Sequence, residues 1–273
     1  MEESKTRTLF PRIAVGLSLG GIFILSLLHP LAFTTLAAVV AALGVRELRT
    51  VLKAAGWHVP TMAPVAALAI VYSTFLFGAQ GQWFALVGSV AALLAWRVIY
   101  VFITKTQISP RQLLRDLGAS GFTQVYVPLL ISFAVLLAKG ENGIALVFGL
   151  MFTVAMIDTF GYLVGRFFGR VQMMPRISPK KTWEGFAGSV AGALFGGLVT
   201  GYLISAQPWF GLVFGLAILF SSVLGDLSES LIKRDLKVKD MGDVLPGHGG
   251  FMDRIDSLLP SAFVGYALSI WIL

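Results

Sequence analysis

The sequence predicts an all-α, polytopic membrane protein with about nine transmembrane helices. Three observations support this prediction: 56% of the 273 residues are hydrophobic, only 13% are charged, and long apolar runs alternate with short charged segments. Soluble chains carry about 25% charged residues, whereas a helix that crosses a bilayer needs roughly 20 consecutive apolar residues. A membrane β-barrel would instead show alternating segments of about ten residues. The absence of cysteine excludes disulfides and thiolate chemistry.

Nine apolar stretches have the composition of membrane spans. The first two and the last are short for a bilayer, so residues 12–44 form either two full spans or a re-entrant pair. Basic residues precede the first stretch, as in a signal peptide, but apolar sequence resumes directly after Pro30 and we expect no cleavage. We divide the chain into N-terminal transmembrane helices at 1–140 and a C-terminal catalytic region with cytoplasmic loops at 141–273. The stretches lie near residues 12–28, 31–44, 62–79, 82–103, 121–138, 143–165, 185–205, 208–225 and 258–273.

The basic residues fall on one side of this layout. With nine crossings, 20 of the 21 lysine and arginine residues lie in or nearest to the N-terminal tail and the four loops that share its side, and Lys139 is the exception. The positive-inside rule places that side in the cytoplasm and the C-terminus outside, in a multi-pass protein of the inner (cytoplasmic) membrane. The net charge of +7 then follows from topology and contact with anionic membrane lipids, and we expect no nucleic-acid partner.

Half of the acidic residues, seven of fourteen, lie in one segment, 221–256. Within it Asp226 and Glu229 are three positions apart, and Ser230 and Lys233 follow at four and seven positions from Asp226. On a helix these four side chains share one face. Charges beside membrane-length apolar runs need a partner, because an isolated charge in hydrocarbon costs several kcal/mol.

Asp253 and Asp256 repeat the three-residue spacing after a glycine-rich turn, where we expect a second helix to begin. Paired carboxylates from two helix ends favour Mg²⁺, which prefers oxygen ligands and keeps water and phosphate as co-ligands. Two ions about 3.5–4 Å apart would assist a phosphoryl displacement. A solvated loop with surface ion pairs is the alternative, and it stands equally well for Asp235, Asp240 and Asp243.

The turn reads Pro246-Gly247-His248-Gly249-Gly250 and precedes a predicted helix start near Met252. Glycines let backbone N–H groups approach a ligand closely, and a helix start adds further donors, so this stretch is a candidate phosphate cradle. Taken alone, the stretch favours a loop turn with a surface histidine. The charged residues on both sides favour the cradle.

A second candidate phosphate site is Ser178-Pro179-Lys180-Lys181-Thr182, before another expected helix start. Two lysines and a hydroxyl suit a phosphate, whereas a basic membrane anchor beside an interfacial Trp183 is the alternative. Upstream, Asp158 sits late in an apolar span, where a carboxylate is a functional candidate by default. Its alternative role is to neutralise Arg166.

Glycines recur at four-residue spacing, which permits close helix contact. Packing within one chain and a dimer face are equally good explanations. We assign no role to His29 and His58. The spaced sets are Gly161/Gly165/Gly169, Gly188/Gly192/Gly196 and Gly16/Gly20.

Taken together, these residues resemble the phosphatidate cytidylyltransferase (CDP-diacylglycerol synthase) family. The family signature reads here from Ser230 to Asp256, and the resemblance extends to 225–230, to Ser178–Gly185 and to 158–169. It therefore covers roughly residues 150–260, and the N-terminal half shares only hydrophobic character. The signature positions in register are Lys233, Arg234, Lys239, Asp240, Gly242, Pro246, His248, Gly249, Gly250, Asp253, Arg254 and Asp256.

The resemblance implies a membrane-embedded, Mg²⁺-dependent homodimer that converts CTP and phosphatidic acid into CDP-diacylglycerol and pyrophosphate. It implies metal ligands at Asp226 and Asp253, with either a second divalent ion or K⁺ beside Mg²⁺. We expect Asp256 and Glu229 to bind the metal or support its ligands, and Asp158 is a further metal candidate.

The remaining candidates would bind phosphate groups. The expected contacts to the triphosphate or to the leaving pyrophosphate are Lys233, Arg234, Lys239 and Arg254. The expected contacts to a phosphate of either substrate are Ser178, Lys180, Lys181 and Thr182, and those from the glycine turn are His248, Gly249 and Gly250.

Two other functions stay open. A CTP-dependent lipid kinase of the polyprenol type would share the metal, the nucleotide and the membrane, but would transfer the γ-phosphoryl group and release CDP. A cation-coupled transporter would use the buried carboxylates, although these cluster at one membrane face instead of spreading across the midplane. A CDP-alcohol phosphotransferase is disfavoured, because the sequence lacks a DGxxAR motif followed by spaced aspartates.

Overall fold

The computed structural model describes residues 16–175, 177–242 and 249–271 and consists of two compact units. The first unit comprises residues 1–135 and 236–254, and the second comprises residues 136–235 and 255–273. Gly249, Gly250 and Asp253 therefore belong with the N-terminal helices, whereas Asp226 and Asp256 belong to the second unit.

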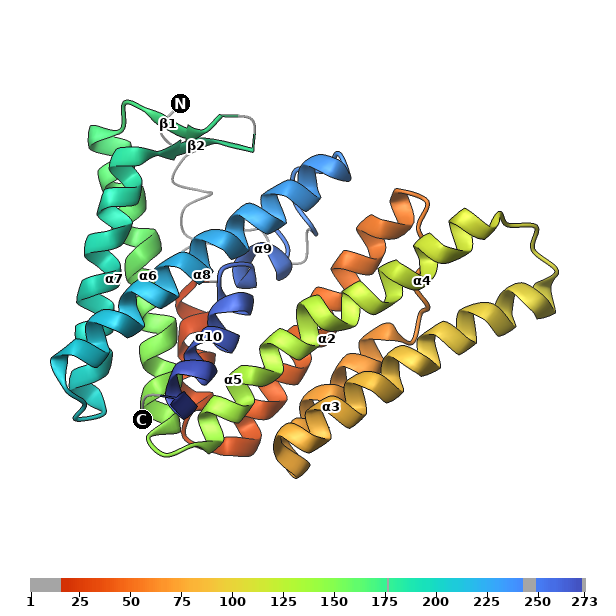
Figure 1. Ribbon diagram of the computed structural model, residues 1–273, viewed down its shortest axis with the longest axis horizontal. Helices are drawn as coiled ribbons and strands as arrows, with labels where there is room; N and C mark the ends of the chain where they lie inside the picture. Colours follow the sequence, from red (N-terminus) through yellow and green to blue (C-terminus); the bar gives the residue numbers. More distant parts are fainter. Residues whose placement is uncertain (1–15, 176, 243–248, 272–273) are drawn as a thin grey trace. The chain divides into compact units, whose positions relative to one another are not determined.

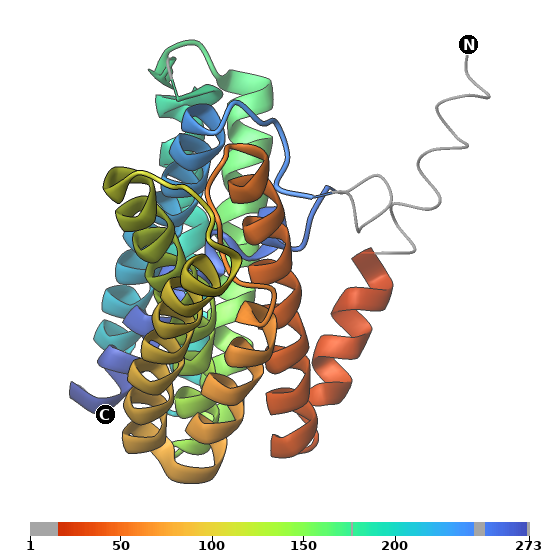
Figure 2. The same ribbon diagram turned by 90° about the vertical axis from the view of Figure 1, so that its right-hand side faces the viewer.

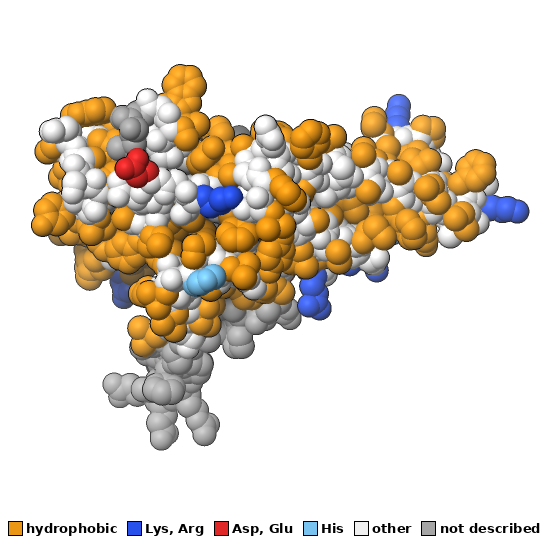
Figure 3. Space-filling model, turned by 90° about the horizontal axis from the view of Figure 1, so that it is seen from below, with side chains coloured by type: hydrophobic (Ala, Val, Ile, Leu, Met, Phe, Trp, Pro, Cys, Tyr) orange, Lys and Arg blue, Asp and Glu red, His pale blue; other side chains and the backbone are white. Residues whose placement is uncertain are grey.

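Helices dominate both units (Figure 1). Six helical stretches of the described chain are long and apolar enough to cross a membrane, and Gly16–Ser26 is a shorter apolar helix. Hydrophobic side chains cover most of the face drawn in Figure 3. The all-α, polytopic class is confirmed, and the number of nine crossings stays a prediction. The elements are α2 (Pro30–Ala54), α3 (Ala63–Thr104), α4 (Pro110–Gln124), η1 (Val125–Leu129), α5 (Leu130–Lys139), α6 (Gly143–Phe168), β1 (Gln172–Met174), β2 (Ser178–Thr182), α7 (Trp183–Leu203), α8 (Pro208–Asp235), α9 (Met252–Ile255) and α10 (Leu258–Trp271).

Several helices are longer than the apolar stretches that predicted them. α2 has 25 residues and is long enough to cross a bilayer on its own, although its predicted span covered only 31–44. α4 begins at Pro110, eleven residues before the predicted start at 121, because Ser109 accepts a hydrogen bond from the Gln112 N–H and a proline suits the first helical position. Polar but helix-favouring residues escape a hydropathy pattern in this way.

α3 reverses direction at Gly78. This glycine has φ 65° and ψ −150°, a conformation outside the helical region. A Cβ atom at Gly81 would overlap the carbonyl oxygen of Ser73, eight residues earlier. In a straight helix those positions would be about 12 Å apart, so the two halves of α3 fold into a hairpin (Figure 2). The halves match the predicted stretches 62–79 and 82–103.

Glycine contacts pack α6 against α7 within the second unit (Figure 1). A Cβ at Gly188 would lie 2.7 Å from the Phe160 carbonyl oxygen, and one at Gly192 would overlap the Met156 carbonyl oxygen. Of the two explanations for the spaced glycines, packing within one chain therefore holds for this set. By contrast, a Cβ at Gly16 or Gly20 would meet nothing within 4 Å.

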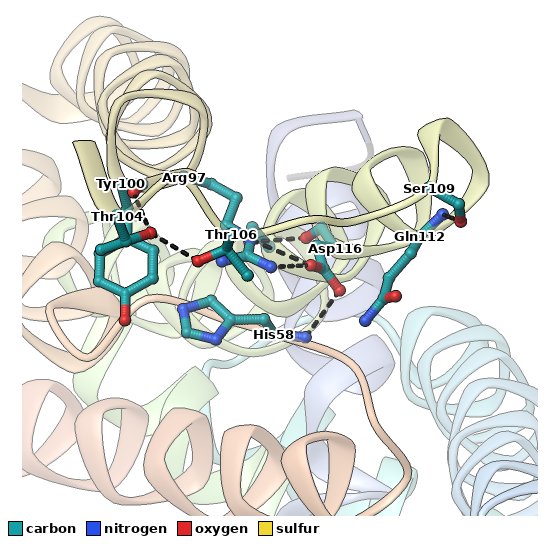
Figure 4. Close-up of polar contacts among 9 residues, drawn as sticks. His58, Arg97, Tyr100, Thr104, Thr106, Ser109, Gln112 and Asp116 are labelled. Atoms are coloured by element: carbon teal, nitrogen blue, oxygen red, sulfur yellow. Dashed lines mark hydrogen bonds and ion pairs between the residues drawn. The ribbon is translucent and has the colours of Figure 1, made fainter. Parts of the chain in front are cut away.

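A buried ion pair joins α3 to α4 in the first unit (Figure 4). The Arg97 guanidinium donates to Oδ2 of Asp116 from Nε at 3.0 Å and from Nη2 at 2.5 Å. The backbone N–H of His58 donates to Oδ1 of the same carboxylate at 2.8 Å. Asp116 is fully buried and Arg97 is 4% exposed. One carboxylate thus connects α3, α4 and the segment around His58.

Asp116→Asn should destabilise the protein strongly, because it leaves the Arg97 charge buried without a counter-charge, at a cost of about 3–5 kcal/mol. Thermal and denaturant unfolding in detergent would measure the loss. The double variant Arg97→Met with Asp116→Leu should be more stable than Asp116→Asn, since it removes both charges. A single variant as stable as the wild type would contradict the structural role of the pair.

Candidate functional site

A cavity of about 430 Å³ lies in the second unit, lined by residues of α6, the β1–β2 hairpin, α7 and α8. This volume is within the range of small-molecule sites. Its polar lining contains both charge signs. The titratable side chains at its wall are Asp158, Tyr162, Arg166, Lys180, Lys181 and Asp226.

Small side chains determine how closely the walls of this cavity approach. A Cβ at Gly161 of α6 would overlap the Ser189 hydroxyl of α7, and that hydroxyl donates to the Ile157 carbonyl at 3.0 Å. A Cβ at Gly165 would lie 3.3 Å from the Thr182 hydroxyl. Because the helices touch through glycine, the residues that follow these glycines on α6 line the same cavity as the end of β2.

The predicted Ser178–Thr182 site is partly a β-strand. β2 pairs antiparallel with β1, with Gln172 opposite Thr182, an element that the sequence analysis did not anticipate. The predicted helix start is confirmed: α7 begins at Trp183, and the Thr182 hydroxyl accepts the Gly185 N–H at 3.1 Å. Glu184 accepts hydrogen bonds from two successive backbone N–H groups at residues 170–171, which fixes the base of the hairpin to α7.

The cavity brings the predicted phosphate-binding residues to two predicted metal ligands. Lys181 Nζ lies 2.5 Å from Asp226 Oδ2, and Asp226 Oδ1 also accepts the Ser230 hydroxyl at 3.3 Å. Asp158 lines the same cavity. Arg166 donates to the Tyr162 hydroxyl at 2.6 Å. Nothing in the local sequence could have predicted the pairing of Lys181 with Asp226, since 45 positions separate them.

α8 runs ten residues beyond the predicted end at 225 and therefore includes residues 226 to 233. The prediction that Asp226, Glu229, Ser230 and Lys233 lie on one face of a helix is confirmed. Lys233 Nζ lies 2.9 Å from Oε2 of Glu229, whose side chain is 1% exposed. Oε1 of Glu229 is buried and has no hydrogen-bond donor among the described residues. A carboxyl oxygen without a donor at this point of α8 is available to a cation.

Asp256 does not lie on the helix that begins at Met252, contrary to the prediction. α9 is a single turn that ends at Ile255, and Asp256 stands before α10 with its Oδ1 accepting the Ser257 N–H at 2.7 Å. A Cβ at Gly225 would overlap the Asp256 carbonyl oxygen, so this backbone lies against α8. Burial raises the pKa of Asp256, and the Asp226 carboxylate raises it further, while the Glu229 carboxyl and the Ser257 N–H act in the opposite direction.

In the first unit, the described backbone N–H groups beside the glycine turn donate hydrogen bonds to carboxylates. Asp253 accepts the Gly250 N–H at 2.7 Å and the Met241 N–H at 3.1 Å. Gly249 has φ +80°, and a Cβ there would lie 2.9 Å from Asp253 Oδ2. His248 and the preceding residues of the turn lie outside the described residues. The phosphate-cradle interpretation stays a prediction, and the described donor at Gly250 is engaged by Asp253.

Glu47 is a further residue at this turn that was not predicted from the sequence. Its Oε1 accepts the Phe251 N–H at 3.0 Å and its Oε2 accepts the Met252 N–H at 2.9 Å. Glu47 is 5% exposed and lies on α2. A signal was present, because it is the only acidic residue between positions 4 and 115, in a largely apolar region.

The other predicted phosphate contacts lie at the surface. Arg234 Nε donates to the Ile177 carbonyl at 3.4 Å, within the second unit. Lys239 and Arg254, in the first unit, are exposed. Asp240 is exposed, as a solvated loop would have it, and Asp235 is exposed at the end of α8. Asp243 lies outside the described residues.

The second unit offers oxygen ligands that suit a hard cation. Four carboxyl groups, at Asp158, Asp226, Glu229 and Asp256, influence one another electrostatically, and the two lysines paired with them are Lys181 and Lys233. A divalent ion would offset the remaining negative charge and satisfy buried carboxylate oxygen. Among the described residues, no three acidic or histidine side chains form a group that could hold a metal by themselves. Asp226 and Asp253 lie in different units, so their joint role stays a prediction.

Comparison with known proteins gives one consistent result. Residues 10–271 match the cytidylyltransferase family. A phosphatidate cytidylyltransferase of Mycobacterium bovis is 39% identical over 268 residues, which covers 95% of this chain and 88% of that protein. The phosphatidate cytidylyltransferase of Mycobacterium leprae is 38% identical over 273 residues, covering 96% and 88%. Phosphatidate cytidylyltransferase 4 of Arabidopsis thaliana, a chloroplastic protein, is 46% identical over 116 residues, covering 42% and 29%.

Asp256→Asn should stabilise the protein at neutral pH without divalent cations. A raised pKa means that the folded state binds the proton more tightly than the unfolded state, so stability is lost as pH rises through the folded pKa. Asparagine removes this loss. Unfolding temperatures in EDTA from about pH 4 to about pH 8 would measure it, with the advantage of the variant growing toward high pH.

Asp235→Asn is the matched control, since Asp235 is exposed on the end of α8. Its unfolding temperature should follow that of the wild type at every pH. An Asp256→Asn variant that is less stable than the wild type at about pH 8 would contradict the conclusion that the Asp256 charge is held at a cost.

Proposed function

Because the chain belongs to the cytidylyltransferase family, we propose that it transfers the cytidylyl group of CTP to phosphatidate, forming CDP-diacylglycerol and pyrophosphate for phospholipid synthesis. The observation that carries this proposal is the cavity of the second unit, where Lys180, Lys181 and Arg166 share a wall with Asp158 and Asp226. Basic side chains for phosphates and carboxylates for a cation meet there at the ends of apolar helices. Such a site suits a lipid substrate with an anionic head group.

The chemistry needs no nucleophilic side chain. An ionised phosphate oxygen of phosphatidate attacks the α-phosphorus of CTP, and the bond from that phosphorus to the oxygen bridging to the β-phosphate breaks, releasing pyrophosphate. Catalysis then consists of positioning the two anions and neutralising their charge. In our proposal Lys180, Lys181 and Arg166 bind phosphate oxygens, with Ser178 and Thr182 as hydroxyl partners.

We propose Mg²⁺ as the cofactor, with Asp226 and Asp253 as its main protein ligands. Asp158, Glu229 and Asp256 would bind the ion or hold its ligands, and K⁺ or a second divalent ion would accompany it. The ion would supply positive charge to the phosphates during transfer. Two carboxylates suffice, because Mg²⁺ keeps waters and substrate phosphates in its coordination shell. Two observations support a cation near the end of α8: Oε1 of Glu229 has no donor among the described residues, and the pKa of Asp256 is raised.

In the proposed reaction Lys233, Arg234, Lys239 and Arg254 bind the triphosphate or the leaving pyrophosphate, and the turn around Gly249 contacts the nucleotide. Lys233 also holds Glu229 in place through their ion pair on α8.

We also propose the inner membrane as the location, with the N-terminus and the charged loops in the cytoplasm, where CTP is made. The placement of 20 of 21 basic residues supports this orientation. A homodimer is part of the same proposal.

Product analysis tests the proposed reaction most directly. The purified protein in detergent would receive phosphatidate, α-labelled CTP and Mg²⁺. We expect label to enter the lipid phase with one pyrophosphate released per lipid labelled. Label that stays in water as CDP would identify a lipid kinase, and no consumption of CTP with cation flux in vesicles would identify a transporter; either result would contradict the proposal.

The same assay tests the cavity. Lys181→Met should lower kcat by about 100-fold, because the transferred phosphates lose a positioned charge. Lys53→Met is the matched control, since Lys53 is exposed near the end of α2, and it should keep near-normal activity. Equal activities of the two variants would contradict the role of the cavity.

A further inference from the structure

The Glu47 carboxylate makes two hydrogen bonds to backbone that lies more than two hundred residues away in the sequence. Its oxygens accept the N–H groups of Phe251 and Met252 at 3.0 and 2.9 Å, across sequence separations of 204 and 205 residues. Both bonds have a carboxylate acceptor, which makes them stronger than ordinary backbone hydrogen bonds; the bond from Met252 is buried and the bond from Phe251 is partly buried. α2 is thereby tied to the start of α9.

The two glycines nearest this carboxylate make room for it. A Cβ at Gly242 would lie 2.6 Å from Glu47 Oε1, and its three nearest atoms would all belong to Glu47. A Cβ at Gly250 would lie 2.5 Å from Glu47 Oε2 and 2.8 Å from the backbone nitrogen of Gly242. Neither glycine has a positive φ, in contrast to Gly249. The approach of Glu47 therefore explains glycine at 242, and the approach of Glu47 together with the Gly242 backbone explains glycine at 250. A left-handed backbone conformation explains neither.

Asp253 is held by the same short piece of backbone. It accepts the N–H groups of Gly250 and Met241. Gly250 directly precedes the two residues whose N–H groups bind Glu47. Three successive N–H groups, from Gly250 to Met252, thus point to two carboxylates. Releasing Glu47 would free the two N–H groups that follow Gly250, and the bond that orients Asp253 depends on the Gly250 backbone.

We propose that Glu47 is a positioning residue, which fixes the backbone of residues 249–252 and through it the direction of the Asp253 carboxylate. This inference rests on the proposed function, in which Asp253 acts at the site. Glu47 itself touches neither substrate nor metal in this proposal. Its effect should therefore appear in the rate of transfer more than in the binding of phosphatidate.

Hydrogen exchange on the full-length protein in detergent tests the contact without any substrate. In Glu47→Gln the carboxamide keeps one acceptor oxygen and turns an N–H₂ donor toward a backbone donor. We expect the amides of Phe251 and Met252 to exchange about tenfold faster or more, with α6 and α7 unchanged. Glu141→Gln makes the same chemical change on an exposed turn and should alter nothing in this segment.

A double-mutant cycle tests the contact independently. Gly242→Ala should destabilise the protein, because its Cβ collides with Glu47. In a Glu47→Ala background the same alanine should cost much less, since the three atoms nearest to its Cβ have been removed. Additive effects of the two changes on the unfolding temperature would overturn the contact.

Kinetics separate positioning from simple support of the fold. In Glu47→Gln we expect kcat to fall about tenfold or more, with the KM for phosphatidate within about threefold of the wild type. Unchanged exchange at 251–252, faster exchange throughout the protein, or a normal kcat despite local exchange would each overturn the proposal. A wild-type protein that transfers no cytidylyl group would instead overturn the proposed function, while exchange would still report whether Glu47 holds the turn.

Discussion

A carboxylate inside an apolar, membrane-spanning chain must have a partner, and much of this structure follows from that constraint. Asp116 has an arginine and a backbone N–H, and Glu47 has two backbone N–H groups. These acidic groups lock helices and turns together. In the second unit the compensation is less complete, since Glu229 keeps a buried oxygen with no donor among the described residues and Asp256 is half-buried near other carboxylates. That difference separates groups that hold the fold from groups that suit a cation.

Glycine packing supplies the geometry in which those carboxylates meet basic side chains. α6 and α7 approach so closely that a Cβ at Gly192 would overlap backbone, and no larger residue could stand there without moving a helix. Lys181 leaves β2 one residue before Thr182 caps α7, and reaches Asp226 on α8. Small residues therefore do more than pack the second unit: they bring the lysines of β2 to Asp158 on α6 and Asp226 on α8.

The sequence predicted what depends on neighbouring residues. The membrane class, the common face of Asp226 and Ser230 on α8, and the helix starts at Trp183 and Met252 follow from local hydropathy, spacing and capping. The β1–β2 hairpin was missed, because a five-residue strand rich in lysine resembles a loop. Glu47 was missed for a different reason: its partners lie 204 and 205 positions away, and only folding brings them within hydrogen-bond distance.

The proposal that the carboxylates of Asp226 and Asp253 form a divalent-cation site can be tested by measuring cation binding directly. Mn²⁺ would serve as a paramagnetic probe for Mg²⁺, titrated into purified protein in detergent and followed by electron paramagnetic resonance. We predict a saturable site in the wild type that is weakened about tenfold or more in both Asp226→Asn and Asp253→Asn, and unchanged in Asp235→Asn. Wild-type binding in both of the first two variants would contradict the account.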